Sequence, residues 1–346
     1  MVLRRVALAK SPVSEMNLEL ATGANDNPIL SVIICTHNPR PDYLSRVTEA
    51  LKGQTLATEH WELLFIDNAS SERLEDVWNL SWHPKARHMR EEELGLTPAR
   101  LRGIRESRGK LLVFVDDDNV LGPDYLAQAV RLERRWPLLG AWGGSVSGEF
   151  ERQPEPWTQL YWDYVCVREC KEARWSNNPE DWSSLPFGAG LCLRAEVASL
   201  YAQEHEATPY RMMLGRNGAG QMSGEDIDMV FFSRRLGLGF GRFPELRMSH
   251  LIPARRLTED YLVELVRCTT LSNVLLNEMH SGVPVQIDQR RPAVFWSLLH
   301  LLRHGRRSFR FHRAKVTGIL KGRRLLETAT CGADDKLKIE GHSPRP

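Results

Sequence analysis

The chain lacks paired cysteines. Its six cysteines stand apart in the sequence, and none forms a Cys-x-x-Cys pair: Cys35, Cys166, Cys170, Cys192, Cys268 and Cys331. Cys166 and Cys170 are spaced for one helix face, but no second pair completes a zinc site. We therefore expect reduced thiols in a cytoplasmic protein.

Long apolar runs are also missing. No run approaches the ~18 apolar residues that a membrane span needs. The first 27 residues contain two arginines but no apolar segment long enough for a signal peptide. We expect residues 1–28 to be a mobile leader in front of the folded domain.

Acidic residues are absent from one long segment. From Arg290 to Arg324 the chain has eleven Lys/Arg and no Asp/Glu, although the net charge of the whole chain is only +2. The remainder therefore carries −9, and residues 286–346 are predicted to form a basic helical extension with a mobile end. Either its apolar side packs on the domain while its basic side offsets that charge, or it lies on an anionic membrane. No nucleic-acid-binding motif accompanies the basic residues, so we expect no nucleic acid partner.

Glycine-rich phosphate loops are absent too. The turns after the apolar runs match neither GxGxxG nor GxxxxGK[ST], which excludes a Rossmann dinucleotide fingerprint and a P-loop. Instead, apolar runs at 29–35, 61–66 and 111–115 alternate with helical patterns. This alternation predicts an α/β fold with a mostly parallel central sheet flanked by helices.

Each apolar run ends in a polar cluster. The clusters are Thr36-His37-Asn38, Asp67-Asn68 and Asp116-Asp117-Asp118. Because ligands of such sheets bind beyond the carboxyl ends of the strands, three aligned clusters predict one shared pocket.

The three adjacent aspartates are the most unusual of these clusters. Two unit charges about 4 Å apart repel by roughly 4 kcal/mol at an effective dielectric of about 20, so neighbouring carboxylates need a reason such as a bound cation. On an extended strand Asp116 and Asp118 point to the same face. Together with diphosphate oxygens they would form the oxygen site that Mg²⁺ or Mn²⁺ prefers. A solvated loop or a structural calcium site is the alternative.

An ordered set of motifs resembles glycosyltransferase family 2, which has the GT-A fold. In chain order the motifs are SVIICTHN (31–38), FIDNAS (65–70), ARLRGI (99–104), VFVDDDN (113–119), FGAGLCLR (187–194), GEDIDMVFFSRRLG (224–237) and His250. The resemblance covers residues 30–280, and we expect the GT-A domain to span 29–285. It implies a nucleotide-diphosphate sugar donor, usually a divalent metal, and typically inversion at the anomeric carbon.

The resemblance also implies roles for individual residues. Nucleotide-sugar binding would involve Thr36, His37, Asn38, Asp67, Arg100, Asp116 and Asp117. The metal, Mn²⁺ or Mg²⁺, would be held by Asp118, Asp116 and His250. Glu225 and Asp226 would form the catalytic acid cluster, with Asp226 as the general base that takes the acceptor's proton. We expect the acceptor near Gly188, Gly190 and Trp182, in a region where residues 150–185 depart from the family pattern.

Several of these residues have a structural alternative. Ser223 and Asp226 fit a capping box, in which the acid would only serve the helix N-terminus. His250 can be a satisfied polar residue, and His37 a turn residue at a strand end. The tryptophans between 157 and 182 more often pack than stack on sugar, and the two glycines can serve tight packing.

We therefore expect an inverting glycosyltransferase that moves a sugar from a nucleotide-diphosphate donor, UDP by default, to a hydroxyl of a glycan or lipid-linked acceptor. The expected setting is envelope polysaccharide synthesis at the cytoplasmic side of the membrane, with peripheral contact through residues 290–324. Two other classes stay open: a sugar-phosphate nucleotidyltransferase and a non-catalytic nucleotide-sugar-binding module. The former should carry a glycine-rich phosphate loop after its first strand, where this chain has THNPRP.

Overall fold

The computed structural model describes residues 27–205, 211, 214–215, 222–281 and 293–339. The strands in this part of the chain are β1 (Leu30–Thr36), β2 (Trp61–Asn68), β3 (Ala86–Glu91), β4 (Leu111–Asp116), β5 (Asn119–Leu121), β6 (Leu139–Phe150), β7 (Arg174–Ser176), β8 (Cys192–Arg194) and β9 (Gly239–Ile252). The α-helices are α2 (Pro41–Lys52), α3 (Leu74–Val77), α4 (Leu96–Glu106), α5 (Tyr125–Arg135), α6 (Ala195–Glu204), α8 (Glu225–Phe231), α9 (Glu259–Ser281) and α10 (Ala293–Ile339). Short 3-10 helices are η1 (Thr58–His60), η2 (Pro156–Val165), η4 (Phe232–Leu236) and η5 (Ala254–Leu257).

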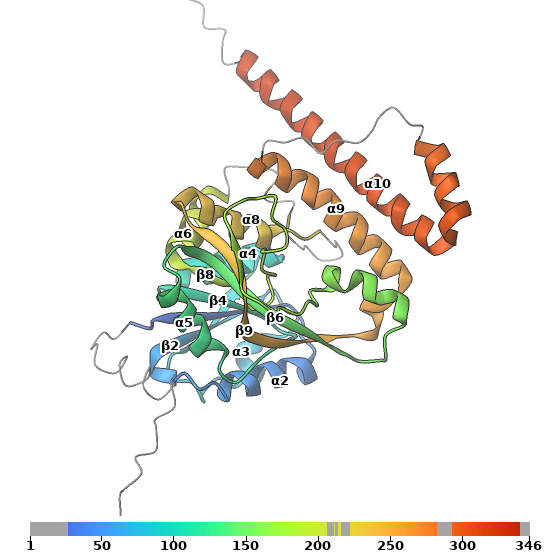
Figure 1. Ribbon diagram of the computed structural model, residues 1–346. Helices are drawn as coiled ribbons and strands as arrows, with labels where there is room; N and C mark the ends of the chain where they lie inside the picture. Colours follow the sequence, from blue (N-terminus) through green and yellow to red (C-terminus); the bar gives the residue numbers. More distant parts are fainter. Residues whose placement is uncertain (1–26, 206–210, 212–213, 216–221, 282–292, 340–346) are drawn as a thin grey trace, which may run out of the picture.

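The strands form one sheet with the order β3-β2-β1-β4-β8-β6-β9-β5, and β7 pairs with β9 (Figure 1). The predicted parallel arrangement holds from β3 to β4, where each neighbouring pair is parallel. Beyond β4 the sheet is mixed, because β8 runs antiparallel to both β4 and β6 while β6 and β9 are parallel. The α/β fold class is confirmed.

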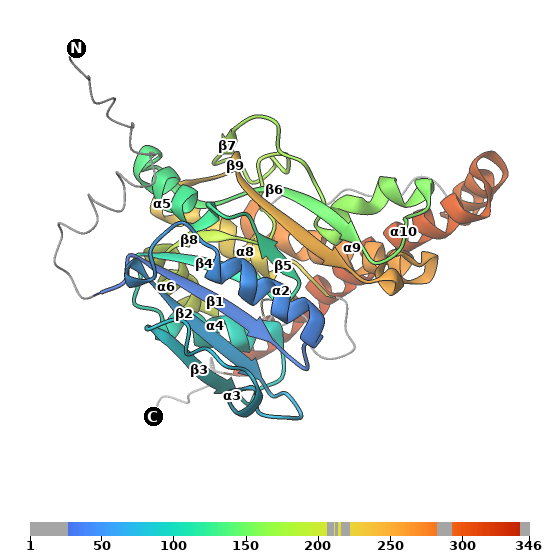
Figure 2. The ribbon, with the colours of Figure 1, turned by 90° about the horizontal axis from the view of Figure 1, so that it is seen from below.

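Two apolar layers flank the sheet, as the period-two alternation of strand side chains requires. Along β1, Val32 and Ile34 enter one layer, and Ile33 and Cys35 enter the other. Helices α2, α3 and α5 cover the first layer, and α4, α6 and α8 cover the second (Figure 2). Helix α8, which carries the acid pair, is therefore anchored by buried apolar residues on the same side as α4.

The strand register brings the polar clusters together. Thr36 of β1 pairs with Asp67 of β2, and Cys35 of β1 pairs with Asp116 of β4. The prediction that the three clusters share one edge of the sheet is confirmed. Short strand β5 then returns beside β9, where Asn119 pairs with His250.

The C-terminal residues form a helical hairpin of α9 and α10. Helix α10 is interrupted at Gly305, whose φ of 78° is not helical. One stripe of α10 is buried: Phe311, Ala314, Gly318 and Gly322. The two glycines allow close approach to α9, since a Cβ on Gly318 would lie 2.5 Å from the carbonyl oxygen of Arg267. Over these residues the extension packs on the rest of the protein, which is the first of the two predicted interpretations.

Ion pairs support the same contact. Arg307 and Arg310 both pair with Glu259 at the start of α9, at 3.0 and 2.6 Å. Phe311 stacks on Tyr161 of η2, with 3.8 Å between the ring centroids. No helix among the described residues is long and apolar enough to cross a membrane.

Candidate active site

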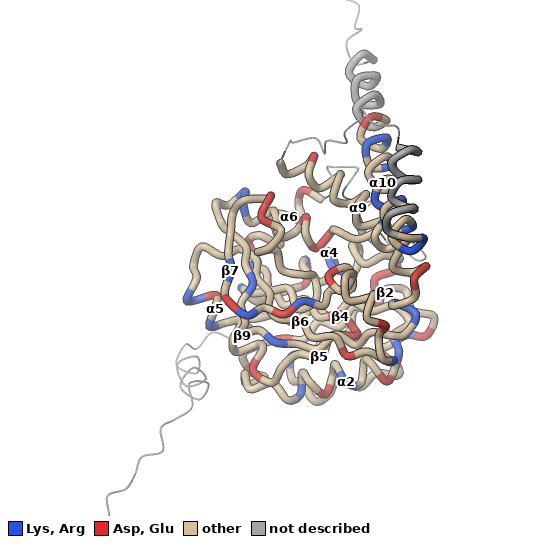
Figure 3. Tube along the Cα trace, turned by 45° about the vertical axis from the view of Figure 1, so that its right-hand side comes forward, with Lys and Arg blue, Asp and Glu red and all other residues tan. Residues whose placement is uncertain are grey.

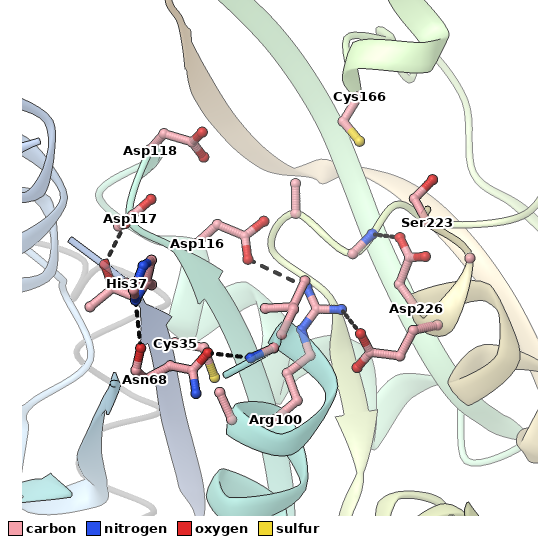
Figure 4. A pocket seen from close by; sticks show the side chains of 18 of the residues that line it. Cys35, His37, Asn68, Arg100, Asp116, Asp117, Asp118, Cys166, Ser223 and Asp226 are labelled. Atoms are coloured by element: carbon pink, nitrogen blue, oxygen red, sulfur yellow. Dashed lines mark hydrogen bonds and ion pairs between the residues drawn. The ribbon is translucent and has the colours of Figure 1, made fainter. Parts of the chain in front are cut away.

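A cleft of about 340 Å³ lies at the carboxyl edge of β1, β2 and β4. Its other walls come from the starts of α4 and α8, the end of η2, and the end of β9 with η5. Figure 4 shows the aspartate triplet on one side of this cleft and Asp226 with Ser223 on the other. Of the predicted residues, the cleft is lined by Thr36, His37, Arg100, Asp116, Asp117, Asp118, Gly188, Glu225, Asp226 and His250.

The three aspartates do not share one direction. Strand β4 ends at Asp116, and Asp117 and Asp118 form the turn before β5. The argument that Asp116 and Asp118 point to one face of an extended strand is therefore wrong. Asp116 instead faces Arg100, with 3.4 Å between Oδ1 and the guanidinium. Asp117 accepts a hydrogen bond from the hydroxyl of Thr36.

Burial and neighbouring charge alter the chemistry of Asp117. Burial, followed by the neighbouring Asp118 carboxylate, raises the pKa of Asp117 to about 7, although the hydroxyl of Thr36 opposes the shift. Near neutral pH this carboxyl group is therefore balanced between its two protonation states. A cation bound beside it would favour the charged form.

Asp118 and His250 face each other across β5 and β9. Asp118 Oδ2 lies 3.3 Å from His250 Nε2, and both side chains are nearly buried. A carboxylate and an imidazole suit Mn²⁺, and such ions commonly take only one or two protein ligands beside substrate phosphates. The pair fits a two-ligand metal site, while no cluster of three or more Asp, Glu, His or Cys suited to a metal occurs among the described residues.

Arg100 is the buried cation of the cleft. It projects from α4 between Asp116 and Glu225, and its guanidinium lies 3.7 Å from Glu225 Oε2. Glu225 is only 2 % exposed. Burial raises the pKa of Glu225 to about 7, and the positive charge of Arg100 opposes that shift. This geometry makes Glu225 a partner of Arg100.

Asp226 has a different environment. Its Oδ2 accepts a hydrogen bond from the backbone N–H of Gly188 at 2.8 Å, and its Oδ1 accepts one from Ile227 N–H at 3.0 Å. Helix α8 starts at Glu225 with Gly224 as N-cap, and no side chain caps it. The capping box of Ser223 and Asp226 is therefore not formed. The carboxylate is held at the cleft wall by a segment far away in the chain.

The nucleotide side of the cleft differs from the prediction in two residues. His37 lines it and bonds the carbonyl of Asn68 through Nδ1 at 2.8 Å. Asp67 and Asn38 do not line it. Asn38 donates its backbone N–H to Ser70 Oγ at 3.0 Å.

Asp67 is buried below this wall and stabilises the turn that follows β2. It accepts hydrogen bonds from the backbone N–H groups of Ser70 and Leu74 and pairs with Arg90 at 2.8 Å. Burial alone would raise the pKa of Asp67, but the hydrogen bonds from Ser70 and Leu74 and the charge of Arg90 bring it below its usual value. In this structure Asp67 organises the loop that carries Asn68, which does line the cleft.

Only one of the three predicted acceptor residues lies at the cleft. Gly188 lines the cleft, but Gly190 and Trp182 do not. Gly190 has a φ of 69°, and its carbonyl accepts a hydrogen bond from Tyr125 at 2.6 Å. Trp182 packs edge-on against Phe231, with ring centroids 6.4 Å apart. For these two residues the packing alternative describes the structure.

Sequence reasoning missed several residues of the cleft, among them Tyr164, Cys166 and Arg256. Arg256 lies in the run PARR directly after the strand of His250. Its closeness to His250 in the sequence could have indicated that it lines the cleft. Tyr164 and Cys166 come from the stretch that departs from the family pattern, and their spacing gives no comparable signal.

Comparison with known proteins shows what this part of the chain is similar to. The family described as Glycosyl transferase family 2 matches residues 31–187. Residues 31–187 are therefore similar to that family. The match contains the cleft-lining residues from Cys35 to Cys166. Gly188, α8, β9 and η5 lie beyond it.

Curated relatives are similar over shorter segments. A validoxylamine A glucosyltransferase of Streptomyces hygroscopicus subsp. limoneus is 33% identical over 129 residues, which are 35% of this chain and 28% of that protein. A glucosyl-dolichyl phosphate glucuronosyltransferase of Haloferax volcanii is 27% identical over 174 residues, 49% of this chain and 53% of that protein. The chain thus spans about a quarter to a half of the length of these relatives. A crystal structure of GalNAc-T7 with UDP, GalNAc and Mn²⁺ has 15% identity and a TM-score of 0.48, covering 77% of this chain and 53% of that one.

Proposed function

We propose that this protein is an inverting glycosyltransferase that uses a nucleotide-diphosphate sugar, UDP-linked by default, and a hydroxyl acceptor. One observation carries the proposal: the fixed carboxylate of Asp226 and the Asp118–His250 pair line the same cleft from different sides. Inversion needs a base on the face of the sugar opposite to the leaving group. In this arrangement the diphosphate would lie toward Asp118 and the acceptor toward Asp226.

Asp226 would act as the general base. Its carboxylate lines the cleft, and the backbone N–H of Gly188 holds it in place. A base must reach the acceptor hydroxyl within hydrogen-bond distance. A carboxylate that is already held in one orientation loses less conformational freedom when it does so. Glu225 would keep Arg100 in position, because it is too buried to meet the acceptor.

The charges of the cleft support a role for a divalent cation. Its lining contains five carboxylates but only two guanidinium groups, and a nucleotide diphosphate would add further negative charge. Asp118 and His250 would hold the ion, Mn²⁺ or Mg²⁺, and Asp116 would serve Arg100 instead of the metal. When bound, the ion would supply positive charge to the departing diphosphate.

Thr36, His37, Asn68 and Arg100 would form the nucleotide side. The nucleotidyltransferase alternative is less well supported. Such an enzyme needs free backbone N–H groups after its first strand to cradle phosphate, whereas Asn38 N–H already binds Ser70. A panel of nucleotide-diphosphate sugars, read by thermal shift and by nucleotide release with and without Mn²⁺, tests the assignment. A nucleotidyltransferase would instead release pyrophosphate from a nucleoside triphosphate.

We also propose a lipid-linked or glycan acceptor of envelope polysaccharide synthesis, reached by peripheral contact with an anionic membrane. The name of the Haloferax relative specifies a lipid-linked sugar. The packed stripe of α10 leaves basic residues on its other sides, and Figure 3 shows basic positions along this helix. Arg313, Lys315, Lys321 and Arg324 are exposed. Each such charge near an anionic surface contributes about 1 kcal/mol.

Vesicle co-sedimentation tests the membrane contact. The triple change Arg313→Gln, Lys321→Gln and Arg324→Gln should release the protein from anionic vesicles at low salt and leave its stability unchanged. A matched triple change of the exposed residues Lys110, Arg152 and Lys171 to Gln should not. Equal binding of both variants, or no binding by the wild type, would reject the contact while leaving the transferase assignment in place.

A further inference from the structure

Arg256 contacts both members of the Asp118–His250 pair through one nitrogen. Its NH1 lies 3.0 Å from Asp118 Oδ2 and 3.1 Å from His250 Nε2. The position follows from the chain path: β9 ends at Ile252, Pro253 turns the chain, and η5 carries the arginine back toward the cleft. The backbone N–H of Arg256 bonds the carbonyl of Pro253 at 2.9 Å, which fixes this turn.

The hydrogen-bond roles in this cluster are settled by chemistry. A guanidinium group has donors only, so His250 Nε2 must accept from Arg256. A metal ion would bind through the same lone pair of Nε2 and through an oxygen of Asp118. The other ring nitrogen, Nδ1, is buried and has no hydrogen-bond partner in the described part of the chain. The guanidinium of Arg256 and a metal ion would therefore compete for the same position between Asp118 and His250.

We propose that Arg256 is the resident cation of this site, which occupies the Asp118–His250 pair until a metal ion arrives together with the donor diphosphate. The inference rests on the proposed metal role of that pair. Asp118 is only 6 % exposed, and a buried carboxylate is costly without a positive partner. The guanidinium supplies that partner, so a metal ion alone has to displace a favourable ion pair.

The diphosphate changes this competition. Arg256 lines the cleft, so a guanidinium displaced from Asp118 would meet the phosphate oxygens, with which arginine forms strong charge-assisted hydrogen bonds. Metal and nucleotide would then each favour binding of the other. By linkage the gain is reciprocal. Arg256 would make metal binding depend on the donor and limit loading by free metal.

Mn²⁺ binding measured by electron paramagnetic resonance, which detects the free hydrated ion, tests this role without any turnover. The proteins are wild type, Arg256→Gln, and Arg255→Gln as a control that removes the same charge from an exposed neighbour. Without nucleotide, Arg256→Gln should bind Mn²⁺ about 10-fold more tightly than wild type, the lower end of what groups around metal ligands control. With UDP present, the difference should shrink or reverse. Arg255→Gln should behave as wild type throughout.

Two further variants keep the result interpretable. In the double change Asp118→Asn with Arg256→Gln, the tighter Mn²⁺ binding should be lost. The carboxylate of Asp118 is one of the two ligands that removal of the arginine makes available to the ion. Arg256→Lys keeps a positive charge with a less extended group, so it should gain less than Arg256→Gln, and it replaces that variant if glutamine prevents folding.

The failures are distinguishable. If wild type and Arg256→Gln bind Mn²⁺ equally without nucleotide, yet both bind it with UDP, the role of Arg256 is wrong and the metal site stands. If no variant binds Mn²⁺ even with UDP, the metal role and the inference built on it both fail. Turnover by the same preparations in excess EDTA would show whether the transferase assignment survives that failure.

Discussion

The carboxylate of Asp226 accepts a hydrogen bond from the backbone N–H of Gly188, with 2.8 Å between the two atoms. The bond joins the start of α8 to the segment before β8, 38 residues earlier in the chain. A Cβ on residue 188 would lie 2.7 Å from Asp226 Oδ2. The glycine therefore lets the main chain approach the proposed base closely enough to orient it.

Gly188→Ala tests this orientation. The added methyl group should push the carboxylate aside, and misplacement of a reacting group by about 1 Å can lower the rate by about 100-fold. We expect kcat to fall by about 10- to 100-fold while UDP still stabilises the protein in thermal shift. Gly53→Ala is the control, because its nearest contact would be an ordinary 3.6 Å. An unchanged kcat in Gly188→Ala would contradict the role of the contact.

Asp118→Ala tests the metal pair. The change removes the only carboxylate that faces His250 Nε2 in the described structure, so Mn²⁺ should no longer enhance stabilisation by UDP and turnover should be lost. Asp76→Ala, at an exposed position outside the cleft, should leave both unchanged. Full wild-type activity in excess EDTA would show that the enzyme works without the ion.

Glu225 makes stability depend on pH in a defined direction. Burial raises the pKa of Glu225 from 4.5 to about 7 in the folded state. Its stabilising contribution is therefore complete below about pH 4.5 and is lost as the pH rises through about 7. Glu225→Gln does not titrate, so its unfolding temperature should decline less than that of wild type across this window. Asp117 titrates in the same range, so part of the slope should remain; parallel curves for both proteins would contradict the assignment.

Phe311→Ala tests whether the extension belongs to the fold. Phe311 is buried and stacks on Tyr161 at 3.8 Å, and loss of a buried phenylalanine costs about 3–5 kcal/mol. Leu320→Ala, at a position 52% exposed on the same helix, should change the free energy of unfolding by no more than about 0.5 kcal/mol. Urea denaturation measures both. Equal stability of the two variants would mean that the α9–α10 contact contributes little.

The parallel half of the sheet and its polar edge could be predicted because apolar runs and strand-end clusters are local signals. The directions of the Asp116 and Asp118 side chains could not be predicted in this way, because β4 ends at Asp116. Asp116 then faces Arg100, and Asp118 faces His250. The bond between Gly188 and Asp226 depends on how two distant segments pack, so no local pattern contains it.

The same limit applies to the residues that were misplaced. Asp67 matches a family motif, yet its carboxylate is used by the backbone of Ser70 and Leu74. The expected acceptor residue Trp182 packs its ring on Phe231 instead. In both cases the residue type suggested a contact with substrate, but the side chain already contacts other parts of the protein.

Nucleotide release by Asp226→Asn, with the donor selected from the sugar-nucleotide panel, tests the central claim most directly. The asparagine side chain keeps the size of the carboxylate and can accept one of its two hydrogen bonds, so the protein should fold and still bind the donor. It cannot take the acceptor's proton, and we predict a loss of at least about 100-fold in acceptor-dependent turnover. A folded Asp226→Asn protein that transfers sugar at the wild-type rate would contradict the account.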